Sequence, residues 1–293
     1  MEPHLIKLFA SDLDGTLLGA SHLVSSPVRK AALAVRDAGL RMAVSTGRTF
    51  RTSGDFGFDG LGCDAVCANG SIVLTNENEL IGFETIDPAS VEELLRAFPQ
   101  APFCCIGREH TYVTATKEEF DAGFRESGVT RRVLMAVRMS GMRRSGQSFD
   151  SDQVYGQTLA DIAGKDIAKI NCRTNDAGLE REILDFLAER TETLVNAPFN
   201  PSMFEITKTG VSKATGVGLL AAHYGIAEDE VAVYGDGGND ITMLERFAPY
   251  GHAYAPHGSC DDAKAAASEI IGSNVLHAVP RHIQMTVKSQ AEV

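Results

Sequence analysis

The stretch DLDGTLL, residues 12–18, directly follows a short apolar run, Leu5–Ser11, near the start of the chain. An apolar run of this length before a turn-forming segment is typical of a buried parallel β-strand. In a doubly wound sheet, ligands bind beyond the carboxyl ends of the strands. Asp12 and Asp14 follow such an end. Because alternate residues of an extended chain point the same way, we predict that both carboxylates face one site. An Asp-rich turn around Gly15 is the plainer alternative.

The sequence after this stretch predicts an α/β sheet. Ser25 and Pro27 mark the start of a helix and Gly39 marks its end, since a serine cap, an early proline and a terminal glycine are typical of helix boundaries. Strands are expected after this helix at Leu40–Ser45, Asp64–Ala68 and Ser71–Leu74. Alternation of strands with helices indicates a parallel sheet. It returns near the end of the chain with helix Ser212–Tyr224, strand Val231–Tyr234 and helix Asp240–Phe247.

The middle of the chain has a different pattern, which predicts an inserted α+β module at residues 84–197. Residues 1–83 and 198–293 would then form the first domain. The expected strands of the module are Phe103–Ile106, Tyr112–Thr114, Val133–Val137 and Ile167–Cys172. Its clearest helices are Glu92–Phe98 and Leu179–Arg190. The polar stretch Ser140–Asp152 is expected to be an exposed loop.

A second acidic strand end occurs in VAVYGDGGND, residues 231–240. Glycines follow the apolar strand and let the backbone approach a ligand closely. The helix N-terminus that comes next favours anions, yet Asp236, Asn239 and Asp240 gather there. Carboxylates at this place are reasonable if they hold a hard cation, and Mg²⁺ prefers carboxylate oxygens together with water and phosphate. A helix cap would explain Asn239 but not Asp236.

Two further segments are candidates for binding a phosphoryl group. STGR, residues 45–48, places the Thr46 hydroxyl and backbone N–H groups beside a glycine, which forms a small anion-binding nest. An ordinary strand-to-helix turn explains the same residues. Lys213 begins a helix after the expected strand Met203–Ile206, where its ammonium can reach a phosphoryl group. Lys208 is the competing lysine, and surface solvation is the plain explanation for either.

The charge of the chain limits its partners. The 293 residues carry a formal net charge of -12, and such a chain repels nucleic acid and anionic lipid unless basic residues cluster. The pairs Arg131–Arg132 and Arg143–Arg144 are short and far apart, so we interpret them as solvated surface charge. We expect no nucleic-acid or membrane partner, and either a monomer or a homodimer. Action on an anionic phosphate would then require local positive groups, including a metal.

Composition and length indicate an ordinary globular protein of two domains, with 44% hydrophobic and 23% charged residues. No apolar run approaches the roughly 20 residues that span a bilayer. Met1–Lys7 leads directly into a strand and has no basic region followed by an apolar stretch. None of the six cysteines forms a CxxC pair, so we interpret them as reduced and mostly buried. The expected location is the cytoplasm.

Taken together, these strand ends resemble the haloacid dehalogenase (HAD) superfamily of phosphohydrolases. The resemblance covers nearly the whole chain, through DLDGTLL, STGR, CANGSIV, GVSK and GDGGNDITML in that order. The block between Gly70 and Phe204 lies where Cof-type members carry a large α+β cap. The resemblance implies a doubly wound, mostly parallel, Rossmann-like α/β core with an inserted α+β cap. It also implies an Mg²⁺-dependent phosphatase that acts on small phosphorylated metabolites, such as sugar phosphates or phosphorylated cofactors.

The resemblance also implies a role for each site residue. Asp12 is the expected nucleophile, which forms an aspartyl-phosphate, and Asp14 is the expected general acid and base. Mg²⁺ is expected to be held by the Asp12 carboxylate, the Asp14 backbone carbonyl and Asp236, with Asp240 steadying it from nearby. The expected contacts to the phosphoryl oxygens are Leu13, Thr46, the Gly47 amide, Lys213 and Asn239. Phosphoryl transfer depends on such alignment and charge neutralisation.

One segment departs from the family pattern, and other functions stay open. The chain reads GHAYAPHG at residues 251–258, where similar proteins carry small residues with Met and Asn, and we interpret His252 and His257 as core or surface residues. Phosphomutase chemistry on the same fold is one alternative, and a non-catalytic sensor of phosphorylated ligands is another. Substrate specificity is expected in the inserted module. Its candidates for contacting a second anionic group are Arg108, His110, Arg131 and Arg138.

Overall fold

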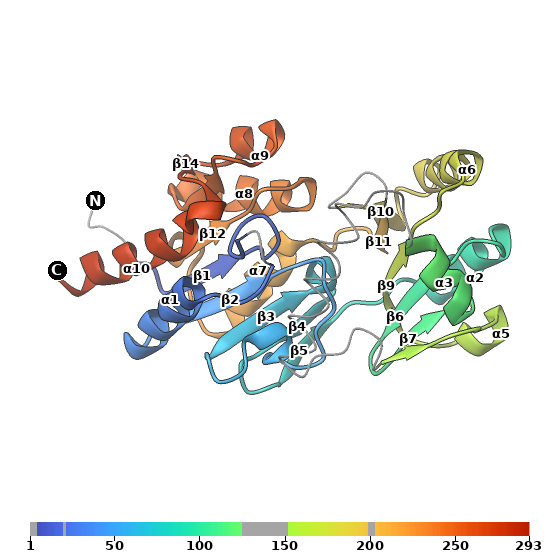
Figure 1. The fold of residues 1–293 in the computed structure, drawn as a ribbon, viewed down its shortest axis with the longest axis horizontal. Coiled ribbons are helices and arrows are strands. Elements are labelled where there is room, and N and C mark those ends of the chain that lie inside the picture. Colours follow the sequence, from blue (N-terminus) through green and yellow to red (C-terminus); the bar gives the residue numbers. More distant parts are fainter. Residues whose placement is uncertain (1–4, 20–21, 125–151, 199–202, 293) are drawn as a thin grey trace. The chain divides into compact units, whose positions relative to one another are not determined.

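The computed structural model describes residues 5–19, 22–124, 152–198 and 203–292. These residues form two compact units (Figure 1). The first unit contains the described residues up to Gly82 and those from Ser212 onward, and the second contains the described residues from Phe83 to Val211. The predicted strand Val133–Val137 lies outside the described residues, as do Arg131, Arg138 and the predicted loop Ser140–Asp152 except its last residue.

The first unit is built on an eight-stranded sheet in the order β14-β13-β12-β1-β2-β3-β4-β5. Neighbouring strands from β14 to β3 are parallel, and β4 is antiparallel to β3. In chain order the strands are β1 Leu8–Ser11, β2 Arg41–Ser45, β3 Cys63–Cys67, β4 Ile72–Leu74, β5 Leu80–Phe83, β12 Val231–Tyr234, β13 Ala253–Pro256 and β14 Glu269–Ile271. This arrangement confirms the predicted α/β class.

Helices cover both faces of this sheet, as a doubly wound fold requires. They are α1 Ser26–Asp37, α7 Lys213–His223, α8 Ile241–Phe247, α9 Asp261–Ala266 and α10 Ala278–Ala291. On one face, Leu8 and Ala10 of β1 belong to a buried cluster with Val217 of α7 and Leu244 of α8. Phe9 points to the other face because successive residues of a strand alternate. Helices α1 and α10 pack against each other (Figure 1).

A tight turn after β3 brings the start of α7 against the sheet. Ala68, Asn69 and Gly70 have φ values of 51°, 58° and 98° in succession, all in the left-handed region. A Cβ atom at Gly70 would lie 2.0 Å from the carbonyl oxygen of Ser212, so only glycine allows this approach. The turn therefore fixes where α7 begins, and with it the position of its first residue, Lys213.

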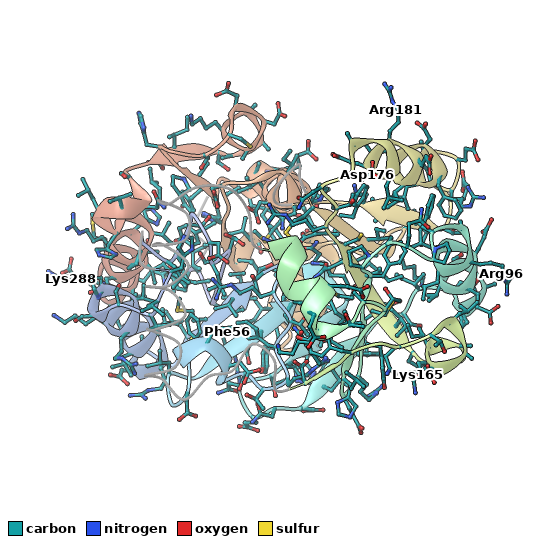
Figure 2. The ribbon with its side chains drawn as sticks, turned by 45° about the vertical axis from the view of Figure 1, so that its right-hand side comes forward. Phe56, Arg96, Lys165, Asp176, Arg181 and Lys288 are labelled. Carbon is teal, nitrogen blue, oxygen red and sulfur yellow. The ribbon has the colours of Figure 1, made fainter. Side chains whose placement is uncertain are left out.

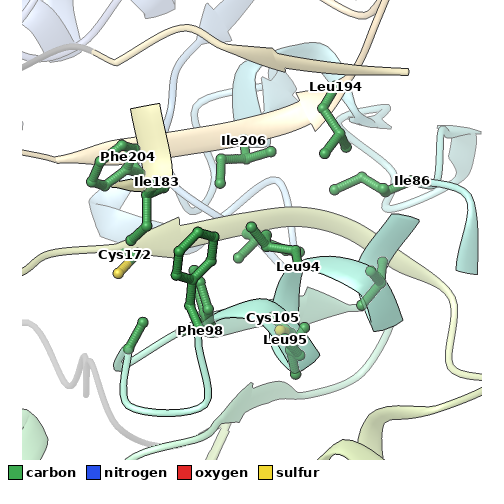
Figure 3. Packing of buried hydrophobic residues seen from close by; sticks show 14 of the residues in the cluster. Ile86, Leu94, Leu95, Phe98, Cys105, Cys172, Ile183, Leu194, Phe204 and Ile206 are labelled. Atoms are coloured by element: carbon green, nitrogen blue, oxygen red, sulfur yellow. The ribbon is translucent and has the colours of Figure 1, made fainter. Parts of the chain in front are cut away.

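The second unit contains a six-stranded sheet in the order β10-β11-β9-β6-β7-β8. Its strands are β6 Cys104–Gly107, β7 Thr111–Val113, β8 Gln153–Val154, β9 Ile167–Cys172, β10 Leu194–Asn196 and β11 Phe204–Lys208. Its helices are α2 Pro88–Ala97, α3 Lys117–Phe124, α5 Leu159–Ile162 and α6 Ala177–Ala188. Leu94 of α2 and Ile183 of α6 share a buried cluster with Cys105, Ile170 and Ile206 of the sheet (Figure 3). An α+β pattern was expected for this part of the chain.

The second unit extends further along the chain than the predicted module. Strand β11 pairs with β9 and β10 in the six-stranded sheet, so the chain returns to the first unit at Ser212 and not at residue 198.

Charged side chains such as Arg96, Arg181 and Lys288 are exposed and point away from the ribbon (Figure 2). Among the described helices, none is both long enough and apolar enough to cross a bilayer.

All six cysteines are described, and none of them forms a disulfide bond. Cys63, Cys67, Cys105 and Cys172 are buried, Cys104 is half-buried and Cys260 is exposed. Burial raises the pKa of the Cys63 thiol to about 12, so this side chain stays protonated at neutral pH. The buried thiols therefore behave as small apolar side chains, as the sequence predicted.

Candidate active site

The parallel register of β1 and β12 brings two distant acidic segments to one edge of the sheet. Ser11 pairs with Tyr234, so Asp12 and Asp236 follow the ends of neighbouring strands. The backbone N–H of Asp12 donates a hydrogen bond to the Tyr234 carbonyl oxygen at 2.9 Å. The convergence of residues from both ends of the chain is therefore a direct consequence of strand order.

The turn after β1 contacts Asp236 closely. The Thr16 hydroxyl donates a hydrogen bond to Asp236 Oδ1 at 2.5 Å. Gly15 has a φ of 94°, and a Cβ atom at this position would lie 2.3 Å from Asp236 Oδ2. A side chain at residue 15 would therefore displace the carboxylate as well as strain the backbone. The DLDGTLL turn consequently fixes the position of Asp236 in addition to supplying Asp12.

Lys213 lies between two carboxylates in the interior of the first unit. Its Nζ atom is 2.6 Å from Asp12 Oδ1 and 2.6 Å from Asp240 Oδ1. The lysine side chain is fully buried, so these ion pairs are shielded from water. Burial lowers the pKa of Lys213, but the charges of Asp12 and Asp240 outweigh this effect and raise the pKa above its ordinary value. Lys213 therefore remains a cation.

Asp240 shapes the loop after β12. Its Oδ2 atom accepts hydrogen bonds from the backbone N–H groups of Asp236 and Gly237, both at 2.9 Å. Its Oδ1 atom is bound to Lys213. One buried carboxylate thus closes the loop that carries Asp236 and also holds the lysine, which explains why Asp240 is completely buried.

Three carboxylates form a group that fits a divalent cation. Asp12, Asp236 and Asp240 each offer an oxygen, and these atoms lie within 4.8 Å of one another. Asp12 Oδ2 is buried and accepts no hydrogen bond from the described residues. Burial raises the pKa of Asp12 against the opposing effect of Lys213, and the charges of Asp240 and Asp236 raise it further. One lysine cannot neutralise three carboxylates, and hard oxygen donors of this kind suit Mg²⁺.

The pKa of Asp236 predicts that cation binding depends on pH. Burial, reinforced by the charge of Asp240, raises the pKa of Asp236 to about 6 in the metal-free protein, although the Thr16 hydrogen bond opposes the shift. A proton on this carboxylate competes with a metal, so we expect the apparent affinity for Mg²⁺ to be about tenfold weaker at pH 5 than at pH 7.5. Calorimetric titration with Mg²⁺ measures this difference. An affinity that does not change between these pH values would contradict the prediction.

The same pKa has a consequence for the metal-free protein. The folded state binds the Asp236 proton more tightly than the unfolded chain does. The stability from this proton is present below about pH 4 and is lost as the pH rises through about 6. In the Asp236→Asn variant, which cannot ionise here, both this loss and most of the pH dependence of Mg²⁺ binding should disappear. Chemical unfolding with EDTA present measures the first effect.

The predicted phosphate-binding residues Thr46 and Asn239 are linked through Asn69. The Thr46 carbonyl oxygen accepts a hydrogen bond from the Asn69 N–H at 3.1 Å. The Asn239 side-chain amide donates to Asn69 Oδ1 at 3.1 Å, which ties the loops after β3 and β12 together. The Thr46 hydroxyl accepts from the Arg48 N–H at 3.2 Å, and Gly47 lies half-buried between these two residues. The Leu13 side chain is fully buried, so only its backbone can meet a ligand.

The Asp14 carboxylate has its own partners. It is not among the three grouped carboxylates, and it contacts Arg48 and His22. Arg48 Nε donates to Asp14 Oδ2 at 2.7 Å, and Arg48 Nη2 donates to Oδ1 at 2.5 Å. His22 Nδ1 lies 2.5 Å from the same Oδ1 atom. Asp14 is therefore held in a fixed orientation by two basic side chains.

Four of the residues that make these contacts were not predicted as site residues from the sequence. Arg48 and Asn69 lie inside recognised segments, STGR and CANGSIV, and their position at strand ends was the available signal. Thr16 likewise lies inside DLDGTLL. His22 lies outside every motif, and its contact with Asp14 depends on a left-handed turn at φ 53° that composition and spacing do not reveal.

The remaining residues that the sequence analysis named as candidates make contacts of other kinds. Lys208, the competing lysine, is half-exposed on β11 and pairs with Glu84 at 2.8 Å. The His252 carbonyl oxygen accepts from the Val233 N–H, and His257 is exposed. In the second unit, the Arg108 guanidinium lies 4.6 Å from the ring centroid of Phe83. His110 makes an edge contact with the Tyr112 ring.

The sheet order and the acidic strand ends define a class of protein. Residues 9–283 match the model of the haloacid dehalogenase-like hydrolase family, so the chain belongs to this family. The recognition made from the five motifs is therefore confirmed, and so is the fold that it implied.

Similar proteins agree with this assignment along their whole length. Phosphatase YwpJ from Bacillus subtilis is 26% identical, and the alignment covers 94% of this chain and 97% of that protein. The 5-amino-6-(5-phospho-D-ribitylamino)uracil phosphatase YcsE of the same organism is 22% identical, with 95% of each chain covered. The solved structure of a haloacid dehalogenase-like hydrolase from B. subtilis aligns with a TM-score of 0.78 at 24% identity, over 95% of this chain and 99% of that chain.

Proposed function

We propose that this protein is an Mg²⁺-dependent phosphatase that hydrolyses small phosphorylated metabolites through an aspartyl-phosphate on Asp12. The observation that carries the proposal is the buried arrangement of Asp12, Lys213 and Asp240, in which Asp12 Oδ2 has no hydrogen bond from the described residues. A carboxylate with one oxygen held by a lysine and the other unengaged is suited to act as a nucleophile beside a cation.

In the first step, an oxygen of Asp12 attacks the phosphorus atom while the bond from phosphorus to the leaving oxygen breaks. Asp14 gives its proton to that oxygen, so the alcohol leaves in its neutral form. In the second step, Asp14 takes a proton from water as the water oxygen attacks phosphorus, and the bond between phosphorus and Asp12 breaks. Inorganic phosphate is released, and Asp12 is a free carboxylate again.

The cation would be held by the carboxylates of Asp12 and Asp236 and by the Asp14 carbonyl oxygen, with Asp240 supporting the loop. When bound, Mg²⁺ supplies positive charge beside the phosphoryl oxygens and helps to align them. Lys213 adds a second positive charge from the protein itself, and these charges offset the repulsion between an acidic chain and an anionic substrate. The Thr46 hydroxyl, the backbone N–H groups of Leu13 and Gly47, and Asn239 are proposed to contact the phosphoryl oxygens.

The relatives and the second unit support the proposed substrate class. YcsE is named for a phosphorylated ribitylamino-uracil, which supports small phosphorylated metabolites as the class for this chain. We assign substrate selection to the six-stranded unit as an inserted cap, because the strand-end residues described above can recognise only the phosphoryl group. Cytoplasmic location, and no nucleic-acid or membrane partner, remain the predictions made from the sequence.

A substrate panel tests this proposal. The purified protein should release phosphate from p-nitrophenyl phosphate and from at least one sugar phosphate when Mg²⁺ is present, and EDTA should remove the activity. Colorimetric phosphate detection measures both. Absence of turnover on the whole panel would contradict the phosphatase assignment. Equilibrium binding without turnover would indicate a sensor, and an isomerised sugar phosphate in place of free phosphate would indicate a mutase.

A further inference from the structure

We infer that His22 is a positioning residue for Asp14, and that it is needed for substrates whose leaving group requires a proton. This inference rests on the proposed function. His22 Nδ1 lies 2.5 Å from Asp14 Oδ1. When Asp14 is ionised, its carboxylate only accepts hydrogen bonds, so Nδ1 then carries the hydrogen and donates it. Together with the two bonds from Arg48, this contact leaves the carboxylate little freedom to rotate.

The surroundings of His22 indicate that its contact with Asp14 is a specific feature of the fold. His22 has a φ of 53°, a left-handed conformation that few residues other than glycine adopt without strain. Its backbone N–H donates to the Gly19 carbonyl oxygen at 2.9 Å. The side chain of His22 is 32% exposed and that of Asp14 is 18% exposed, so the contact is partly shielded from water. A merely solvated surface histidine would require neither this backbone conformation nor this contact.

The other support for Asp14 is itself held in place. The Arg48 guanidinium carbon lies 5.0 Å from the ring centroid of Phe56, which is labelled in Figure 2, and the Arg48 side chain is only 12% exposed. The Phe56 ring in turn lies 4.9 Å from the ring of Phe50. The Arg48 side chain that contacts Asp14 is therefore itself packed against an aromatic ring. His22 makes the second contact with Asp14, from the loop that follows DLDGTLL.

In the steps up to departure of the leaving group, the orientation of Asp14 matters only when the leaving oxygen needs a proton. The alkoxide that leaves a sugar phosphate is a far stronger base than p-nitrophenolate, which departs readily without protonation. A misplaced general acid should therefore reduce kcat/KM for a sugar phosphate, and hardly change it for p-nitrophenyl phosphate. The constant kcat/KM reports the steps up to departure of the leaving group, so later hydrolysis of the aspartyl-phosphate does not obscure the comparison.

The test compares His22→Asn with His22→Asp. The two side chains have nearly the same shape and both tolerate the left-handed backbone, but asparagine donates a hydrogen bond to Asp14 and aspartate repels it. In His22→Asp, kcat/KM for the sugar phosphate that the wild-type protein hydrolyses fastest should fall about 10²-fold, with a change below about threefold for p-nitrophenyl phosphate. His22→Asn should stay within about fivefold of the wild-type values for both esters.

The outcomes separate the possible explanations. Equal losses on both esters, or no loss in His22→Asp, would overturn the role of His22. Equal effects of the two substitutions would also overturn it, because the donated hydrogen bond would then be irrelevant. A wild-type protein that hydrolyses only p-nitrophenyl phosphate would show that no positioned acid is used. Failure of the wild-type protein on both esters would contradict the proposed phosphatase itself.

Discussion

The Asp12→Asn variant should lose phosphatase activity by at least about 10³-fold, because an amide cannot form the acyl-phosphate. Acid quenching during turnover, followed by mass spectrometry, should detect a phosphorylated protein for the wild type and none for the variant. Stability should not fall in parallel. Burial raises the pKa of Asp12, which means that the interior disfavours its charge, and a neutral amide of the same shape avoids that cost. Thermal unfolding in EDTA measures this part of the prediction.

Asp64→Asn is the matched control for this experiment. Asp64 is also a completely buried aspartate whose pKa is raised by burial, but it lies near the start of β3, away from the loop that follows this strand. Its Oδ1 atom accepts hydrogen bonds from the Asn76 N–H and the Tyr224 hydroxyl, which an asparagine oxygen can also accept. The control should keep its activity. Equal losses in both variants would indicate a general effect of changing buried charge, and would contradict the role of Asp12.

Replacing Lys213 with methionine should cause the largest loss of stability. Methionine fills similar space, but it leaves the carboxylates of Asp12 and Asp240 buried without their shared cation. Breaking a buried ion pair in this way costs about 3–5 kcal/mol in the free energy of unfolding. Because the unpaired buried carboxylate charge grows as these groups ionise, the deficit in the free energy of unfolding should increase with pH. Chemical unfolding in EDTA at two pH values measures it, and added Mg²⁺ should recover part of the loss.

Lys208→Met provides the comparison for Lys213. Lys208 pairs with Glu84, and both side chains are about half exposed, so the substitution should change the free energy of unfolding by no more than about 1 kcal/mol. Phosphate release should fall in Lys213→Met and remain near the wild-type rate in Lys208→Met. If Lys213→Met unfolds within about 1 kcal/mol of the wild type in EDTA, the account of a buried, charge-coupled centre is wrong.

The sequence allowed the first-unit fold and the meeting of Asp12 and Asp236 to be anticipated, for a physical reason. Parallel strands bring their carboxyl ends to one edge, so polar residues that directly follow apolar runs must converge. The return point at residue 198 was misplaced because β11, with the sequence FEITK, is a short strand of alternating apolar and polar residues, and such a strand suits either sheet until its pairing with β9 is known. Patterns of apolar residues do not specify a pairing partner.

Other parts of the site depend on contacts that no local pattern encodes. Asp240 accepts hydrogen bonds from two backbone N–H groups because of the way the loop after β12 turns. The orientation of the Asp14 carboxylate depends on Arg48 and His22, which approach from different loops. Contacts between residues of different loops therefore determine these parts of the site.

The order of strands also affects how the protein is made. Strand β1 pairs with β12 through the register of Leu8 with Val231. The central strand β1 is therefore synthesised long before its neighbour β12, which lies most of the chain length further on. Until then, one row of backbone N–H and C=O groups on β1 is open to pairing with other chains. Contacts of such long range slow folding and leave nascent chains prone to aggregation. Low temperature or chaperone supply should therefore improve the yield of native protein during expression.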